Sequence, residues 1–112
     1  MIPPPDRADP QLDLNEALGI AREINAPAAE AWALWCLSLH HLGTGQFGLA
    51  LEAVHRSRDV ASSIGHLEWI AGTHAILGAI YVELLAPELA RPELEKALAL
   101  AEKLQSRHWI HY

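Results

Sequence analysis

Apolar residues recur along this chain at three- and four-residue steps, the spacing that places side chains on one face of an α-helix. The first such stripe comprises Leu14, Ala17, Leu18, Ala21 and Ile24. The β-branched residues are also scattered at helical spacing, and no segment alternates between apolar and polar as a half-buried strand would. The pattern therefore predicts an all-α fold.

Proline, glycine and asparagine divide this pattern into about five helices. We expect helices over residues 10–24, 27–42, 46–64, 67–85 and 87–104. Asp9 is placed to cap the first helix, with Pro10 at its first position. Asn25 and Gly65 tolerate the left-handed conformation that ends helices. The short connections between the segments predict antiparallel helical hairpins.

The last helix has two expected irregularities. Pro92 is expected to delay its regular start by a turn, because proline is poorly tolerated beyond the first turn. We expect this helix to end at Gln105 and Ser106, and Trp109 is expected to begin a further helix.

The chain also aligns with itself, without a gap, at an offset of forty residues. Ala21, Ala61 and Ala101 superpose in this alignment, and Trp69-Ile70 meets Trp109-Ile110. A fixed period in this range is typical of solenoids, in which each repeat buries its apolar face against its neighbours. We therefore expect residues 9–112 to form one helical-repeat domain and residues 1–8 to form a disordered tail.

Several repeated positions resemble the tetratricopeptide repeat. They are Leu37-Ser38, His41, Gly45, Phe47, Ala50, Val54 and Ser57 and, in a better match, Leu77-Gly78, Tyr81, Ala90, Leu94 and Ala97. Leu34 and His74 fall where that family has a tryptophan, and the period of 40 exceeds the usual length of about 34. The longer period resembles the long-helix variant of bacterial LuxR-like regulators.

The resemblance implies that alternate helices line a concave surface. In that arrangement the candidate contacts for a partner are Trp32, Trp35, Leu39, Leu42, Ala75, Ala79, Tyr81 and Glu83. We expect a non-enzymatic module that binds a protein or peptide, as part of a larger bacterial signalling or transcriptional regulator. Alternatively, a small effector occupies the same surface, or the tryptophans only fill space above Gly72, Ala75 and Ala79.

Charge and composition narrow the expected partners. The formal charge of −6 and the few close basic pairs disfavour binding of nucleic acid by this segment. The N-terminal residues lack the features of a signal peptide, and the apolar stretches are interrupted before they could span a membrane. The single cysteine, Cys36, excludes an internal disulfide. We expect a cytoplasmic protein.

The sequence holds little that predicts catalysis, and we expect neither enzymatic activity nor a cofactor. The seven histidines are interpreted as packing or surface residues and not as metal ligands. His108 and His111 have ligand spacing, but a metal site there would need a further converging ligand. Cys36 is interpreted as an inert thiol, and Glu93 as part of a solvated helix surface with Lys96.

Both ends of the repeat pattern are incomplete. The first helix corresponds to the second helix of a repeat, and it bears an apolar stripe with no preceding partner helix. Solenoids normally need polar caps at both ends. We therefore expect either a fragment of a longer array or self-association through the uncapped ends.

Overall fold

The computed structural model describes residues 9–110, with side chains described for residues 9–105. This part of the chain folds into five α-helices and contains no strand, which confirms the predicted all-α class. The helices are α1 (Pro10–Glu23), α2 (Pro27–Gly43), α3 (Phe47–Ser63), α4 (Leu67–Glu83) and α5 (Pro87–Ile110). The tail predicted over residues 1–8, and the residues His111 and Tyr112, lie outside the described residues.

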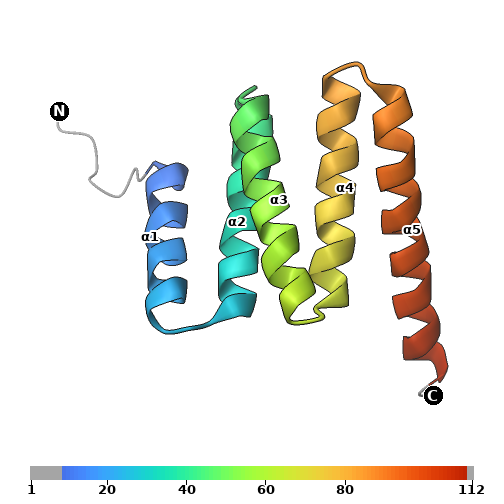
Figure 1. Cartoon of the computed structure of the whole chain (residues 1–112), viewed down its shortest axis with the longest axis horizontal. Helices are drawn as coiled ribbons and strands as arrows, with labels where there is room; N and C mark the ends of the chain where they lie inside the picture. The colour runs from blue at the N-terminus through green and yellow to red at the C-terminus, as the bar shows by residue number, and fades with distance from the viewer. Residues whose placement is uncertain (1–8, 111–112) are drawn as a thin grey trace, which may run out of the picture.

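The helices form a stack of antiparallel hairpins in which each helix lies beside its neighbours in the chain (Figure 1). The helix α2 also contacts α4, its equivalent forty residues later, whereas within the described residues the backbones of α1, α3 and α5 do not approach one another as closely. The stack measures 55 × 36 × 25 Å. This is the helical-repeat architecture that the forty-residue offset predicts.

The connections between the helices repeat every twenty residues, a shorter period than the offset found in the sequence. The residues with positive φ are Asn25, Gly45, Gly65 and Leu85. At each connection the next residue donates its backbone N–H to the carbonyl five positions back, as from Ala26 to Ala21 and from Ala86 to Tyr81, both at 2.8 Å. This is the bond that closes a Schellman motif. Each connection therefore has the same local geometry.

Two apolar clusters form the core. One joins α1, α2 and α3 through Leu18, Ala33, Leu34, Leu37 and Ala53. The other joins α2, α3 and α4 around Ala50, Val54, Ile76, Leu77 and Ile80. The hydroxyl of the buried Ser57 donates a hydrogen bond of 2.8 Å to the carbonyl of Ala31, so it adds a polar link between α3 and α2.

The start of the first helix follows the prediction. Asp9 precedes Pro10, and its carboxylate accepts a hydrogen bond of 3.0 Å from the backbone N–H of Gln11. A side-chain acceptor at this position satisfies one of the N–H groups that a helix start leaves free.

Two predictions about the last helix are wrong. The helix α5 begins at Pro87 and includes Pro92, and it continues past Gln105 to Ile110 without a break. Pro92 removes only one backbone N–H, and the packing of α5 along α4 keeps this turn helical. Gln105 lies at the position of Asn25 and Gly65, but it lacks their tolerance of the left-handed conformation, so the helix continues.

Candidate functional site

Two exposed large apolar residues among the candidate contacts lie on α2. The side chains of Trp32 and Leu39 are separated by two helical turns, and they are 44% and 48% exposed, respectively. On α4, which contacts α2, Ala75 is exposed and Ala79 is half-buried. We call Trp32, Leu39, Ala75 and Ala79 the α2–α4 surface. It is an apolar surface on two helices that occupy equivalent places in successive repeats.

Three other predicted contacts lie at the edge of the core. Trp35, Leu42 and Tyr81 are half-buried and pack against the cluster around Val54 and Leu77. Their side chains therefore hold α2, α3 and α4 together while leaving part of each residue accessible. Glu83 is exposed as the final residue of α4.

Trp35 sits directly over Gly72 of α4. A Cβ added at Gly72 would lie 3.0 Å from the indole Nε1 of Trp35, so a larger residue here would require the ring to shift. This is the kind of contact that the packing alternative predicts, although it is made by Trp35 and not by Trp32, the positional equivalent of Gly72. The Nε1 atom is buried and has no hydrogen-bond partner.

Two further aromatic residues, which the sequence interpretation left out, adjoin this contact. The ring of Trp69 lies 6.0 Å from that of Trp35, and the ring of His66 lies 5.6 Å from that of Trp69. His66 also caps α4, since its Nδ1 accepts a bond of 3.3 Å from the backbone N–H of Trp69. The placement of Trp69 one turn before Gly72 was the available signal, because residues three apart share a helix face.

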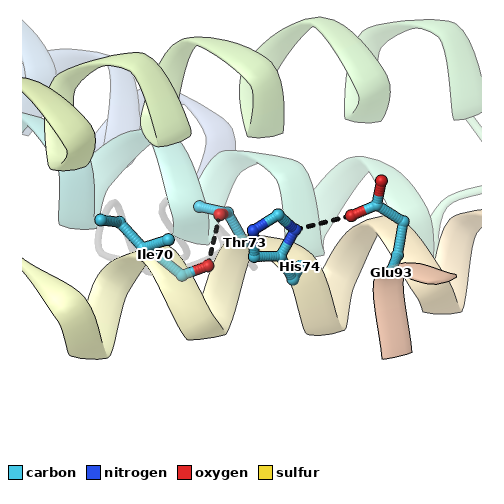
Figure 2. A network of polar contacts seen from close by, with 4 residues as sticks. All are labelled: Ile70, Thr73, His74 and Glu93. Carbon is cyan, nitrogen blue, oxygen red and sulfur yellow. Dashed lines mark hydrogen bonds and ion pairs between the residues drawn. The ribbon is translucent and has the colours of Figure 1, made fainter. Parts of the chain in front are cut away.

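A polar pair joins α4 to α5 on the inside of the last hairpin. The Nδ1 atom of His74 lies 2.6 Å from a carboxylate oxygen of Glu93, and the two side chains are only 12% and 16% exposed (Figure 2). The neighbouring Thr73 turns instead to the carbonyl of Ile70 in its own helix. The interpretation of Glu93 as part of a solvated helix surface is therefore wrong. Its sequence neighbour Lys96 indicates an exposed position, but its partner His74 lies across the hairpin on α4.

This pair takes the place of apolar residues one period earlier. His74 is the equivalent of Leu34, and Glu93 is the equivalent of Ala53, both of which belong to the first buried cluster. Arg58 is in turn the equivalent of Leu18, a member of the same cluster. Three positions that form an apolar contact in one repeat thus carry ionisable residues in the next.

The other ionisable side chains within residues 9–105 form no reaction centre. His41 is buried, and its Nδ1 lies 3.0 Å from the side-chain oxygen of Gln46, in agreement with the packing role predicted for it. Burial raises the pKa of the Cys36 thiol, so the reactive thiolate is disfavoured. Within residues 9–105, no three His, Cys, Asp or Glu side chains converge as a metal site would require. The side chains of His108 and His111 lie outside the described residues.

Three of the surface hollows formed by the described side chains differ in size and lining. One of 550 Å³ lies beside the ion pair between Arg22 and Glu30, whose atoms are 3.1 Å apart, and one of 120 Å³ lies near His41. The third is an apolar groove of 330 Å³ on the α4–α5 hairpin. None of these three is lined by Trp32, Trp35 or Ala79.

Comparison of the chain with known protein families, with curated proteins and with solved structures finds no match. No helix in the described part of the chain combines the length and apolar character that crossing a membrane requires.

Proposed function

We propose that the chain is a helical-repeat module of the tetratricopeptide type that binds a protein or peptide on the α2–α4 surface. The observation that carries this proposal is the exposure of Trp32 and Leu39 on one side of α2, a helix that contacts its equivalent α4. Large apolar side chains that stay exposed together on a folded protein are typical of a recognition surface. Tryptophan in particular is enriched among the residues that dominate binding energy.

The architecture supports the same function. The helices α2 and α4, which are equivalent in successive hairpins, contact each other, so they present a face built from regular secondary structure. A rigid face of this kind lowers the entropic cost of ordering a flexible peptide partner, because only the peptide has to be ordered. The placement of this module in a bacterial signalling or transcriptional regulator rests on the sequence resemblance alone.

The proposal can be tested with a phage-displayed library of random 12-residue peptides, selected against the full chain. Enriched peptides are then titrated against the wild type, Trp32→Ala, Leu39→Ala and a control, Leu89→Ala. Leu89 is a matched control because it is similarly exposed, at 51%, but lies on α5. We expect Trp32→Ala and Leu39→Ala to weaken binding by roughly tenfold or more, and the control to leave it unchanged.

Two results would contradict the proposal. One is a selection that enriches no peptide with saturable binding to the wild type. The other is a set of enriched peptides whose affinity is the same for the wild type, Trp32→Ala and Leu39→Ala, which would place their binding elsewhere on the molecule.

A further inference from the structure

The apolar groove on the last hairpin, a hollow of 330 Å³, has an almost wholly apolar lining. Val82 of α4 and Pro87, Ala90, Leu94 and Leu98 of α5 line it. The α5 residues follow at three- and four-residue steps, so they form one face of the helix. Leu98 is 60% exposed and Val82 is 51% exposed, which is costly for side chains of this kind.

The repeat shows how an equivalent surface is packed elsewhere in the same molecule. Forty residues earlier, the positions of Val82, Pro87, Ala90 and Leu94 are held by Leu42, Phe47, Ala50 and Val54. There, Ala50 and Val54 are completely buried, and Leu42 and Phe47 pack against the same cluster. The residues that cover them come from α4, namely Ile76, Leu77, Ile80 and Tyr81. The groove is thus the counterpart of a surface that is covered by a helix.

We propose that this groove binds an amphipathic α-helix of a partner protein, seated on α4 and α5 as α4 is seated on α2 and α3. The matching helix would carry apolar residues at positions i, i+1, i+4 and i+5, the spacing of Ile76, Leu77, Ile80 and Tyr81. Binding of an amphipathic helix in an apolar groove is a common mode of peptide recognition. The groove is separate from the α2–α4 surface, so this interaction does not depend on the function proposed above.

The rim of the groove adds a charge preference. Arg91 and Glu95, both exposed, stand one helical turn apart at the positions that Leu51 and His55 hold one period earlier. A partner helix would therefore gain from an acidic residue near Arg91 and a basic residue near Glu95, in place of the apolar contact made at Leu51.

A second copy of the chain fits the groove less well than a separate helix. Each copy carries a formal charge of −6, so association of two copies works against charge repulsion. The complementary face of α4 is also occupied within each copy by the contact with α2 and α3. Neither obstacle applies to a partner helix with its apolar face free.

The test uses a synthetic peptide of the α4 sequence, residues 67–83, with two lysines added at each end and a fluorescein label. Its binding to the full chain is measured by fluorescence anisotropy. We expect saturable binding that Val82→Glu and Leu98→Glu each weaken by roughly tenfold or more. Leu89→Glu is the matched control, since it places the same charge on an exposed leucine of α5 outside the groove and should leave the affinity unchanged. Trp32→Ala should leave it unchanged as well.

Circular dichroism of each variant separates a loss of binding from a loss of folding, and exposed Val82 and Leu98 should tolerate the change. The proposal is overturned if the wild type shows no saturable binding, or if the control weakens binding as much as the groove variants. It is also overturned if Leu51→Glu abolishes binding while the groove variants do not, because the peptide would then be replacing α4 in its own place. Sedimentation that shows a dimer dissociated by Leu98→Glu would assign the groove to a second copy instead.

Discussion

The indole Nε1 of Trp35 lies over Gly72, so close that a Cβ on residue 72 would be 3.0 Å away. This contact joins two equivalent helices of successive repeats, and it depends on a glycine in the interior of α4. Glycine at such a position costs roughly 1 kcal/mol of helix stability relative to alanine. The chain therefore gives up helix propensity at this point in exchange for close packing.

We predict that Gly72→Ala does not raise the free energy of unfolding, because displacing the Trp35 ring cancels the gain in helix propensity. Gly19→Ala is the control: Gly19 lies inside α1, and an added Cβ there meets no atom within 4 Å. That variant should be stabilised by roughly 0.5–1 kcal/mol in urea titrations. In a Trp35→Leu background, Gly72→Ala should regain most of this amount. An equal gain from both alanine substitutions in the wild type would refute the argument.

Trp32 and Trp35 should differ sharply in their contribution to stability. Truncation of a fully buried tryptophan costs roughly 3–5 kcal/mol, and the half-buried Trp35 should lose a large part of that amount as Trp35→Ala. Trp32 is 44% exposed, so Trp32→Ala should cost no more than about 1 kcal/mol. Thermal unfolding of the two variants measures the difference. A larger loss from Trp32→Ala would place that residue in the core and weaken the proposed binding surface.

Leu85 has φ of 58° and is 88% exposed, so its side chain gains little from packing. The left-handed conformation costs a residue with a Cβ roughly 1–2 kcal/mol. Leu85→Gly should therefore raise the free energy of unfolding by roughly 0.5–1 kcal/mol, after allowance for the entropy of glycine in the unfolded chain. Its neighbour Leu84, with φ of −80°, is the control, and Leu84→Gly should destabilise the protein.

The polar pair of His74 and Glu93 should be replaceable only as a pair. Either His74→Leu or Glu93→Ala alone leaves one mostly buried polar group without its partner, at a cost of roughly 1–3 kcal/mol. The double variant recreates the apolar pair of Leu34 and Ala53 found one period earlier. We expect it to be as stable as the wild type or more stable, since well-packed apolar residues often replace buried ion pairs without loss.

A double-mutant cycle measured by urea unfolding tests this prediction directly. The two single losses would add in the double variant if the residues acted independently. Additive destabilisation would therefore show that the 2.6 Å contact between His74 and Glu93 contributes no coupling energy.

The thiol of Cys36 should react slowly with iodoacetamide near neutral pH. Burial raises its pKa, so at a given pH the folded chain holds less thiolate than the unfolded chain. The rate ratio of folded chain to chain unfolded in urea should be lowest below the ordinary thiol pKa and should rise as pH increases above it. By linkage, the associated stability is present below the unfolded-state pKa and is lost as pH rises through the folded-state pKa. A ratio that does not vary with pH would indicate limited access in place of a pKa effect.

The fold follows from the sequence where local chemistry and tertiary structure agree. Asp9 and Asn25 have the conformational preferences that their positions demand, so the start and end of α1 could be predicted. Leu85 has the opposite preference, and its turn forms because the helices on both sides impose it. Gln105 shows the complementary case: with no left-handed residue there, α5 continues.

The candidate site was predictable in its location but not in its detail. The period placed large residues of α2 against small residues of α4, but it could not show that Trp35 turns inward over Gly72 while Trp32 remains exposed. The interpretation of Glu93 as a solvated surface residue was wrong for a related reason. Its sequence neighbours indicate solvent, and only the packing of α5 against α4 brings it to His74. Both outcomes depend on contacts between helices, and the spacing of residues along a single helix gives no information about such contacts.

The uniform connections have a consequence for how this molecule can change in size. Gln46 and Ala86 both follow a left-handed residue and both precede the first residue of a helix. Excision of residues 47–86 would join Gln46 to Pro87 through a connection of the same form, and α5 would pack on α2 in the place of α3. Gain or loss of a complete hairpin therefore leaves every remaining turn intact. The length of the stack can vary in steps of forty residues with no change in the connections between its helices.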